Sequence, residues 1–363
     1  MLPVILKRFL IVLAVGSVLM AFAACNRPSA AGIGAPFIKI GVILPDSKSS
    51  ARWETADRRY LGAAFKAAGV DYDIEDAQND RAAFQAIADR MINDGVTVLM
   101  IVNLDSRSGK TVLDRARAQG VQTIDYDRFT VGGSASYYVS FDGVRVGQLL
   151  GEGLVTCLAR QGIYRPLIAE LNGGSDNNAH LFKTGYDSVL DPRYAAGTMV
   201  KGPDQSVPDW DNAQAAAIFT EMMAEHPNID GVLAANDGLA DAAIGILRSY
   251  HRAGTVPVTG QDATVQGLQS ILTGAQCMTV YKAIKRQADA AAGLAIALAR
   301  HQPGHTKQIF TDPSNQRRIP AVLLDPVAIY RSNIKDVIAD GFVTKAELCP
   351  GAYATACVAA GIT

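Results

Sequence analysis

The stretch VTVLMIVNLDSRSGKTVLDRARAQGVQTIDYD, residues 96–127, decides the fold class. It begins with a mostly apolar run from Val96 to Val102, continues with a mixed polar and apolar segment from Ser106 to Gln119, and ends with a second run, rich in β-branched residues, that stops at Asp125. Strands of a parallel sheet are apolar along their whole length because helices cover both faces of the sheet. The stretch therefore predicts a strand–helix–strand unit whose second strand ends in charged side chains.

The same alternation of apolar strands and amphipathic helices continues on both sides of this stretch, from residue 37 to about 140 and again from about 141 to 282. At 363 residues the chain is also too long for one ordinary core. We therefore predict an α/β protein of two domains, each a doubly wound parallel sheet. The predicted elements include strands at 195–200 and 256–262, and a helix at 283–300 and a strand at 320–324 that are candidates to return to the first domain.

The N-terminus has the composition of an export signal. Residues 1–24 contain a short basic segment, an apolar run and small residues directly before Cys25. The apolar run is shorter than the roughly 20 residues that a membrane-spanning helix needs. Ala23–Ala24–Cys25 resembles the lipobox of bacterial lipoproteins, in which the cysteine is acylated, although Phe22 replaces the usual Leu and leaves plain secretion open. Residues 25–36, rich in Pro, Gly, Ala and Ser, are predicted to be a flexible tether from the membrane.

Four further cysteines follow Cys25 in a chain that is expected to reach an oxidising compartment. Cys349 and Cys357 lie close together in the Gly- and Ala-rich tail and are the first candidates for a disulfide. The pairing of Cys157 with Cys277 stays open because it depends on the fold. The chain has no Cys-x-x-Cys motif and its five histidines are scattered, so we predict neither a metal site nor a cofactor.

Polar and charged side chains follow nearly every predicted strand, and in parallel sheets such positions gather at one edge. They are Asp46, Asn103, Asp105, Asp127, Arg128, Asp176, Asn177, Asn178, Asn236, Asp237, Gln261, Asp262, Tyr281 and Lys282. Asp and Asn also cap helices that begin at such points, so any one of them can have a purely structural role. Capping does not explain Arg128, Lys282 or Arg52, because cations are unfavourable at the positive end of a helix dipole.

This mixture of side chains indicates the kind of ligand. Carboxylates accept hydrogen bonds from hydroxyl groups, Arg and Lys donate to them, and Asn does both. An anionic ligand would require a surplus of cations, and the formal net charge of −1 also gives no basic face for nucleic acid. The two tryptophans, Trp53 and Trp210, can pack on the C–H face of a sugar ring or serve as ordinary packing residues. The pattern favours a neutral, hydroxyl-rich ligand in a crevice between the domains.

Several longer segments resemble the D-xylose-binding proteins, periplasmic receptors of sugar ABC importers in the ribose- and galactose-binding group. In chain order these segments are SARWETADRR, YDRF, YYVSFDGVRVGQL, GGSDNNAHLFKTGY, VLAANDGLADAAI, TGQDATVQGLQSILTGAQCMTVYK and SNIKDVIADGF. The resemblance extends from about Lys39 to Phe342, most of the mature chain. Ser206 stands where the family tends to have another Trp, and the tail from Lys345 has no counterpart in it.

The resemblance implies a type I periplasmic binding protein. Three crossovers would connect a lobe of residues 37–140 and 283–322 with a lobe of residues 141–282 and 323–345, followed by a tail of residues 346–363. The implied sugar contacts are Arg52, Trp53, Asp127, Arg128, Asp176, Asn178, Trp210, Asn236, Asp262 and Lys282. We therefore expect a monomeric, extracytoplasmic binding protein, not an enzyme, that captures D-xylose or a related pentose and delivers it to an ABC permease.

Other functions of doubly wound folds have less support in the sequence. PDSKSS follows the first strand where a dinucleotide-binding enzyme has G-x-G-x-x-G, and P-loop, G-x-S-x-G and H-E-x-x-H motifs are missing. A sugar-responsive repressor with the same core needs an N-terminal helix-turn-helix where this chain has an export signal. A receptor that presents a sugar or a short alditol to a signalling partner stays open as the alternative to transport.

Overall fold

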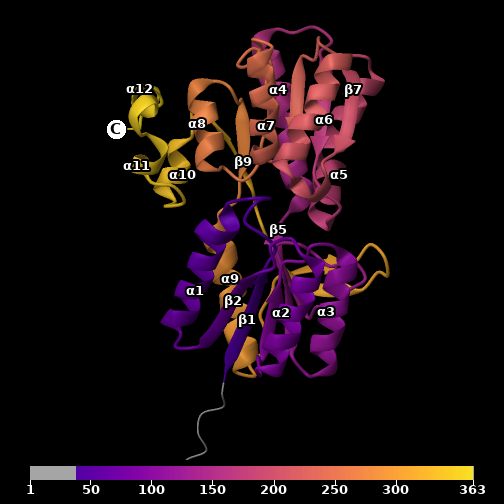
Figure 1. The fold of residues 1–363 in the computed structure, drawn as a ribbon, viewed down its shortest axis with the longest axis vertical. Coiled ribbons are helices and arrows are strands. Elements are labelled where there is room, and N and C mark those ends of the chain that lie inside the picture. The colour runs from indigo at the N-terminus through magenta and orange to yellow at the C-terminus, as the bar shows by residue number, and fades with distance from the viewer. Residues whose placement is uncertain (1–37, 363) are drawn as a thin grey trace, which may run out of the picture. The chain divides into compact units, whose positions relative to one another are not determined.

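The structure, a computed structural model, describes residues 38–362. The predicted signal sequence, Cys25 and the predicted tether lie outside these residues. Two sheets, each with its covering helices, form two lobes within the described part of the chain (Figure 1). Every helix in residues 38–362 is too short or too polar to cross a membrane.

The first lobe contains a seven-stranded sheet in the order β10-β11-β5-β4-β3-β1-β2. Its strands are β1 (Lys39–Leu44), β2 (Asp71–Asp76), β3 (Val98–Ile101), β4 (Gln122–Tyr126), β5 (Tyr137–Phe141), β10 (Gln308–Thr311) and β11 (Arg318–Leu324). Neighbouring strands are parallel except β10 and β11. All four residues of β3 are buried, because this strand is covered on both faces.

Helices pack on both faces of this sheet. They are the π-helical turn η1 (Trp53–Asp57), α1 (Arg58–Ala67), α2 (Arg81–Asn93), α3 (Ser106–Ala118) and α9 (Ile284–Ala299). Alternate residues of the strands point to opposite faces. Val98 and Met100 join one hydrophobic cluster with α1 and α9, while Leu99 and Ile101 join another with α2 and α3. The first lobe is therefore a three-layer α/β/α unit.

The second lobe has a parallel sheet in the order β7-β6-β8. Its named strands, including the antiparallel pair β9 and β12, are β6 (Leu167–Asn172), β7 (Val200–Ser206), β8 (Gly231–Ala234), β9 (Met278–Tyr281) and β12 (Val327–Tyr330). Between β8 and β9 the segment 256–262 forms only single bridges, from Val258 to Val232 and from Gln261 to Val280. The prediction of a full strand at 256–262 was wrong, because the segment pairs with β8 at Val258 and with β9 at Gln261 and forms no continuous ladder with either strand.

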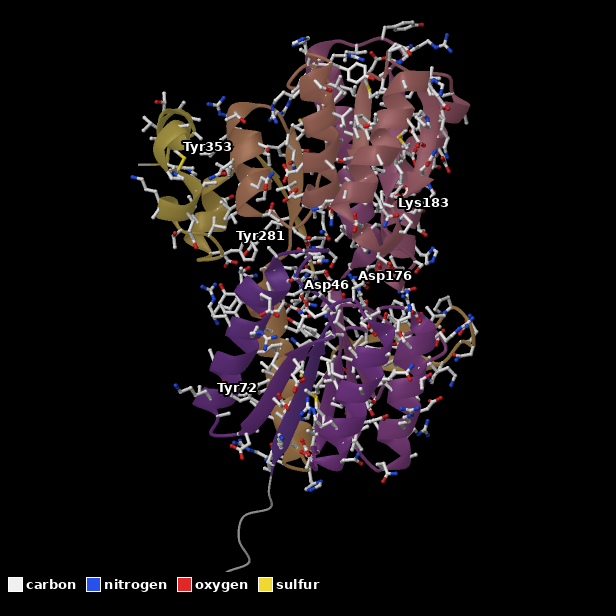
Figure 2. The ribbon with its side chains drawn as sticks, in the orientation of Figure 1. Asp46, Tyr72, Asp176, Lys183, Tyr281 and Tyr353 are labelled. Atoms are coloured by element: carbon white, nitrogen blue, oxygen red, sulfur yellow. A yellow bond between two sulfur atoms is a disulfide. The ribbon has the colours of Figure 1, made fainter. Side chains whose placement is uncertain are left out.

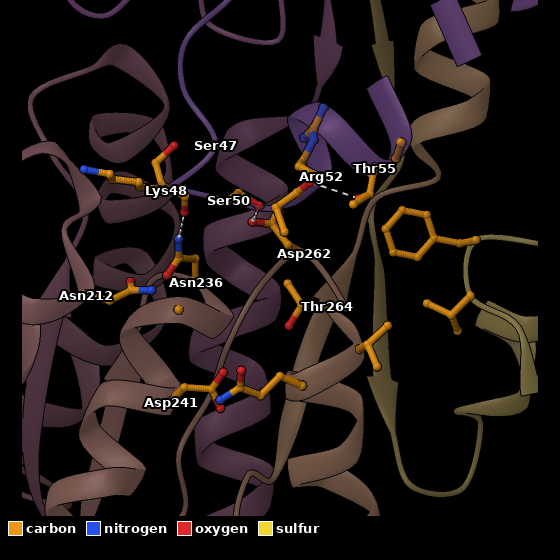
Figure 3. A pocket seen from close by; sticks show the side chains of 18 of the residues that line it. Ser47, Lys48, Ser50, Arg52, Thr55, Asn212, Asn236, Asp241, Asp262 and Thr264 are labelled. Atoms are coloured by element: carbon orange, nitrogen blue, oxygen red, sulfur yellow. Dashed lines mark hydrogen bonds between the residues drawn. The ribbon is translucent and has the colours of Figure 1, made fainter. Parts of the chain in front are cut away.

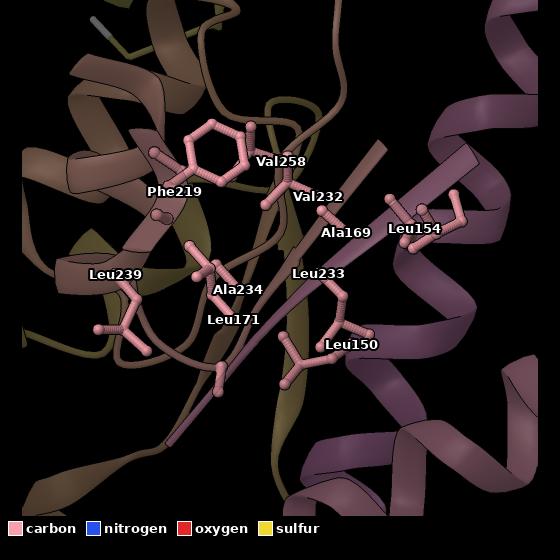
Figure 4. Close-up of a cluster of buried hydrophobic side chains, with 14 of the residues drawn as sticks. Leu150, Leu154, Ala169, Leu171, Phe219, Val232, Leu233, Ala234, Leu239 and Val258 are labelled. Atoms are coloured by element: carbon pink, nitrogen blue, oxygen red, sulfur yellow. The ribbon is translucent and has the colours of Figure 1, made fainter. Parts of the chain in front are cut away.

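The helices of the second lobe again cover both faces of its sheet. They are α4 (Gly143–Gln161), α5 (Asn177–Ala195), the 3-10 turn η2 (Pro208–Trp210), α6 (Asn212–Glu225), α7 (Asp237–Ser249) and α8 (Val265–Thr273). Figure 4 shows Leu150 and Leu154 of α4 on one side of the strands and Phe219 and Leu239 on the other. The expected architecture of two doubly wound α/β domains is confirmed.

A close approach between α4 and α5 fixes the position of α5, which begins at the interface with the first lobe. A Cβ atom on Gly147 would lie 1.9 Å from the carbonyl oxygen of Phe182, and one on Gly185 would lie 2.1 Å from the carbonyl oxygen of Val144. Only glycine allows the two backbones to pack at this distance. The pair of glycines thus sets where the first residues of α5 project.

Two segments differ from the sequence predictions. The predicted strand at 195–200 was wrong, because α5 continues to Ala195 and the next strand begins only at Val200, after a turn at Gly197. The last part of the described chain contains helices that were not predicted. They are α10 (Lys335–Ala339), which precedes the tail, α11 (Lys345–Leu348), the 3-10 turn η3 (Gly351–Tyr353) and α12 (Ala354–Ala359). Leu348 and Cys357 pack with residues of α8 in one cluster, so the tail is attached to the second lobe.

Disulfide bonds join Cys157 to Cys277 and Cys349 to Cys357. The first connects α4 to the start of β9, and the second closes the tail. Three chain segments connect the lobes: between β5 and α4, between β9 and α9, and between β11 and β12. Because β5 extends to Phe141 and β11 to Leu324, two of these crossings lie one and two residues beyond the expected bounds at 140 and 322.

Candidate ligand-binding site

A narrow cavity, here called the slot, lies between the lobes where the strands end. Its volume is about 330 Å³, part of which is open to solvent. The residues that line the slot are Ser49, Ser50, Arg52, Trp53, Asp127, Arg128, Asp176, Asn178, Phe182, Trp210, Asn236, Gln261, Asp262 and Lys282. All ten residues in the predicted contact set are thus brought together in one place. Figure 2 shows Asp176 on the second lobe, at the edge that faces the first.

Asp127 is the centre of a buried polar network. It follows β4 directly, in the left-handed conformation at φ 63°. Its Oδ2 accepts hydrogen bonds from Nη1 of Arg52 and Nε2 of Gln287, each at 3.1 Å, and its Oδ1 accepts one from Nδ2 of Asn178 at 2.9 Å. Burial alone would raise the pKa of Asp127, but the charges of Arg52 and Lys282 outweigh it and hold that pKa well below its usual range. Asp127 is therefore ionised, and its bond to Asn178 joins the two lobes.

Arg52 holds Asp127 and Trp53 in position. Its Nε and Nη2 donate to the two carboxylate oxygens of Asp57 at 2.9 and 2.8 Å, and Nη2 also donates to Oε1 of Gln287 at 3.1 Å. Its guanidinium carbon lies 4.2 Å from the ring centre of Trp53, a cation–π contact. Most donors of Arg52 are thus used inside the first lobe, so its main effect on the slot is to orient its two neighbours.

Arg128 extends from the first lobe toward the second. Its Nη1 donates to the carbonyl oxygen of Asn103 at 3.2 Å, and its Nε lies 4.0 Å from Oδ1 of Asp176. Asp176 caps α5 with Oδ1, while its Oδ2 accepts a hydrogen bond from Nε1 of Trp210 at 2.5 Å. The side chain of Asp176 therefore both caps α5 and lines the slot. Arg128 has neighbours on both lobes but no full ion pair that would use all its donors.

Trp210 is held in the slot by a strained turn. Asp209 and Trp210 both have positive φ, at 53° and 57°, which is uncommon for a bulky side chain and costs on the order of 1–3 kcal/mol per residue. The indole packs edge-on to Phe182, with 6.3 Å between ring centres. It also packs on Gly173, where a Cβ atom would lie only 2.2 Å from the ring. The surrounding packing and the bond to Asp176 keep the indole in this place.

The opposite wall of the slot also carries contacts between the lobes. Nζ of Lys282 lies 3.3 Å from Oδ1 of Asp262. Oδ2 of Asp262 accepts a hydrogen bond from Oγ of Ser50 at 3.0 Å. Asn236 caps α7 with its Oδ1, and its Nδ2 donates to the carbonyl oxygen of Ser49 at 3.3 Å. The loop between β1 and η1 thus touches the second lobe at two points.

Three buried polar atoms of the slot have no hydrogen-bond partner among the described residues. They are Nε1 of Trp53, Oε1 of Gln261 and Oδ1 of Asp262, the last of which is ion-paired with Nζ of Lys282 at 3.3 Å without forming a hydrogen bond. A buried polar atom without a partner costs about 1–3 kcal/mol. One is a donor and two are acceptors, and hydroxyl groups can satisfy both kinds. The slot is therefore prepared for a ligand that both donates and accepts.

The charges around the slot are balanced. Three cations, Arg52, Arg128 and Lys282, face three carboxylates, Asp127, Asp176 and Asp262, and all six residues are buried. Within residues 38–362 no group of three His, Cys, Asp or Glu side chains is arranged to hold a metal ion. An uncharged polar ligand suits this lining better than an anion or a cation, because neither sign is in surplus.

Four lining residues were absent from the predicted contact set. Ser49 and Ser50 lie in PDSKSS, directly after the first strand, so the rule that strand ends gather at one edge could have found them. Phe182 is four residues after Asn178, on the same face of α5. Gln261 adjoins Asp262. The other strand-end residues that the sequence singled out do not line the slot: Asp46, Asn103, Asp105, Asn177, Asp237 and Tyr281.

Comparison with known proteins agrees with this geometry. A model of the periplasmic binding protein domain matches residues 40–303. The chain is 34% identical over 315 residues to the D-xylose-binding periplasmic protein of Haemophilus influenzae, covering 86% of this chain and 92% of the relative. It is 34% identical over 335 residues to the multiple sugar-binding periplasmic protein SbpA of Azospirillum brasilense, covering 85% and 90%. A solved ABC transporter solute-binding protein from Clostridium phytofermentans, with bound β-D-glucose, has a TM-score of 0.79 and 25% identity and covers 85% of this chain and 99% of that one.

This family consists of extracytoplasmic binding proteins and not of enzymes, which confirms the expectation that the chain has no catalytic function. The type I fold with two parallel-sheet domains is likewise confirmed. The chain therefore belongs to the periplasmic sugar-binding proteins of ABC importers.

Proposed function

We propose that this protein captures a neutral pentose, with D-xylose as the first candidate, and delivers it to an ABC permease. The observation that carries the proposal is the balanced, buried set of three cations and three carboxylates around a slot of about 330 Å³. A sugar ring presents hydroxyl groups around its edge and C–H groups on its faces, so it needs both charged side chains and aromatic walls. The slot offers both.

The proposed contacts follow from the hydrogen-bonding atoms of the lining that are available to a ligand. Oδ1 of Asp262 and Oε1 of Gln261 would accept from ring hydroxyls, and Nε1 of Trp53 would donate to one. Arg128 would donate with its remaining N–H groups, while Trp210 would pack on a face of the ring. A hydrogen bond to a charged group is worth about 1.5–3 kcal/mol, so a few of them suffice for micromolar binding, which corresponds to about 8 kcal/mol.

Closure of the lobes is part of the proposal. The bonds from Asn178 to Asp127 and from Ser50 to Asp262 exist only when the lobes are in contact. A ligand that bonds to both lobes adds further contacts to the same arrangement and so shifts the population toward it. The permease would then recognise the closed form, in which both lobes present their surfaces together.

The choice of a pentose is supported by a named relative and not by the volume of the slot. The relative from Haemophilus influenzae is named for D-xylose, whereas that from Azospirillum brasilense is named for several sugars. The side chains around the ring decide which sugars bind tightly. A wrong epimer leaves a buried polar group unpaired, and this lowers the affinity.

Titration calorimetry tests this proposal. D-xylose, D-ribose, L-arabinose, D-glucose, xylitol and erythritol would be titrated into the purified chain. We expect D-xylose or a related pentose to bind with a micromolar Kd and D-glucose to bind more weakly. If none of these ligands binds more tightly than about 1 mM, the chain does not capture a monosaccharide or short alditol of this kind.

A matched pair of variants connects the binding to the slot. Arg128→Ala should raise the Kd strongly, since Arg128 is buried in the slot and no other side chain replaces its donors. Arg115→Ala is the control, because Arg115 pairs with Asp89 on the surface of the first lobe. Equal Kd values for both variants would place Arg128 outside the binding contacts.

We also infer from the sequence that the chain is exported and acylated at Cys25, so that residues 25–36 tether it to a membrane. The small residues before the cysteine and the Pro- and Gly-rich segment after it support this proposal. Mass spectrometry of membrane fractions provides the test. A diacylglyceryl group on Cys25 is the expected result, and a mature chain without lipid would favour plain secretion.

A further inference from the structure

A second, larger cavity adjoins the slot and is called here the outer pocket (Figure 3). It spans about 1220 Å³, including space open to solvent, between the loop after β1, the start of α1, the first turns of α7 and α8, and the segment from Phe342 to Glu347. The slot and the outer pocket share five lining residues: Ser49, Ser50, Arg52, Asn236 and Asp262. Only these side chains and their backbone separate the two spaces, so the outer pocket is continuous with the proposed sugar site.

The partition between the two spaces consists of two hydrogen bonds between the lobes. One runs from Oγ of Ser50 to Oδ2 of Asp262 at 3.0 Å, and the other from Nδ2 of Asn236 to the carbonyl oxygen of Ser49 at 3.3 Å (Figure 3). A serine hydroxyl rotates freely, so the first bond can be replaced by one to a ligand hydroxyl. Oδ1 of Asp262, on a residue that is 6% exposed, accepts no hydrogen bond, although it lies 3.3 Å from Nζ of Lys282. The partition thus contains an acceptor that a ligand passing through it can satisfy.

The outer pocket is lined by groups that suit a neutral polar occupant. Its charged side chains are balanced: the cations are Lys48, Arg52 and Arg59, and the carboxylates are Asp241, Asp262 and Glu347. Its neutral polar side chains are Ser47, Thr55, Asn212, Thr264 and Gln266, and its apolar wall consists of Ala51, Ala56, Val265, Phe342 and Val343. Amides, hydroxyls and an aromatic ring in one wall are the same combination that the slot presents to a sugar ring. A phosphate or a peptide with a net charge would find no excess of oppositely charged side chains in this pocket.

The tail contributes part of this wall. Glu347 belongs to α11, which is held on the second lobe by Leu348 and by packing of Cys357 against α8. Phe342 packs with Ala56 of the first lobe in a small cluster near the crossings. The outer pocket is therefore enclosed from both lobes, as the slot is.

We propose that the outer pocket is a second sugar subsite, which holds a sugar unit linked to the ring in the slot. The protein would then bind the end of a neutral disaccharide as well as a free monosaccharide, and the glycosidic link would pass between Ser50 and Asp262 only after their 3.0 Å hydrogen bond breaks and the loop that carries Ser50 moves away from the second lobe. The outer pocket is also the larger of the two spaces. The inference rests on the proposed function, because it places the first ring in the slot.

Calorimetry with D-xylose and β-1,4-xylobiose on the same preparation tests the second subsite. We expect xylobiose to bind the unmodified chain with a Kd within about tenfold of that for D-xylose. Val265→Trp should fill the outer pocket, because Val265 lines it and does not line the slot. This variant should weaken xylobiose at least tenfold and leave D-xylose within twofold.

Thr273→Trp is the matched control, since it places the same ring on the exposed far end of α8 and should change neither Kd. Thermal melting shows whether each variant folds, and Gln266→Trp, at an exposed position of the same pocket, replaces Val265→Trp if that variant does not. If D-xylose binds and xylobiose does not, or if the Trp in the pocket weakens both sugars equally, the second subsite is refuted while the proposed function stands. If neither sugar binds, the proposed function fails and the subsite fails with it.

Discussion

Replacing Gly173 by alanine is the sharpest single test of how the slot is built. The Cβ atom of alanine would lie 2.2 Å from Cη2 and Cζ2 of Trp210. Non-bonded carbon atoms approach to about 3.5 Å, so the indole must retreat by roughly 1.3 Å. Gly173 does not have the positive φ that would exclude a side chain, so the substitution acts through Trp210 and not through the backbone.

The size of the effect on ligand binding depends on the direction in which the indole of Trp210 moves. It is attached to Asp176 by a 2.5 Å hydrogen bond and packs against Phe182, so the retreat takes space from the slot. Overpacking of this kind costs about 1–3 kcal/mol. If the cost falls on the ligand complex, the Kd for the sugar should rise roughly 5- to 140-fold, at about 1.4 kcal/mol for each factor of ten.

Tryptophan fluorescence and calorimetry measure this effect. Trp53 and Trp210 are the two tryptophans of the chain and both line the slot, so the emission reports on it directly. Gly174→Ala is the control, because its Cβ atom would lie 3.2 Å from Cδ1 of Trp210 and needs a shift of only a few tenths of an ångström. A Gly173→Ala chain that folds and binds as tightly as the unmodified one would show that Trp210 does not form a wall of the ligand site.

Three further predictions concern closure and stability. Asn178→Ala removes the 2.9 Å bond to Asp127 between the lobes, so small-angle scattering should show a more open average form and the sugar Kd should rise; unchanged scattering and Kd would contradict this. Replacing Cys157 and Cys277 by serine removes a link across 120 residues of sequence and should lower the free energy of unfolding by about 2–4 kcal/mol in denaturant titrations, whereas an unchanged midpoint would mean that the link adds nothing. Burial raises the pKa of Asp237 to about 7, against roughly 3.9 in an unfolded chain. Between those values the folded state keeps a proton that the unfolded chain has lost, so the contribution of Asp237 to stability falls as pH rises. The Tm should be lower at pH 8 than at pH 5, since Asp127 is ionised in both states throughout that range, and a higher Tm at pH 8 would argue against a protonated Asp237.

Much of the fold could be predicted because it depends on local patterns. The mostly apolar run at 96–102 predicts a strand covered on both faces, and the mixed segment after it predicts a covering helix. The positions of Asp127 and Arg128 follow from the rule that parallel strands end at one edge. Their role as sugar contacts came from the family resemblance, because strand ends also carry caps such as Asp176 and Asn236.

Other features could not be predicted because they depend on packing between distant segments. Arg52 and Asp57 are five residues apart and form their ion pair across a π-helical turn. The sequence pattern indicated an ordinary α-helix at this place, so a contact between residues five apart could not be predicted. The positive φ of Trp210 is imposed by its surroundings, not by its own preference. The outer pocket depends on the tail, whose place is set by contacts with α8 that no local pattern in 346–363 indicates.

A crystal structure of the protein with D-xylose tests the central claim most directly, since the claim is that side chains from both lobes meet around one sugar ring. We expect density for a single ring in the slot, between Trp53 and Trp210, with carboxylate oxygens of Asp127 and Asp262 about 2.5–3.0 Å from ring hydroxyls. Density for the sugar elsewhere on the molecule, with only water in the slot, would contradict it.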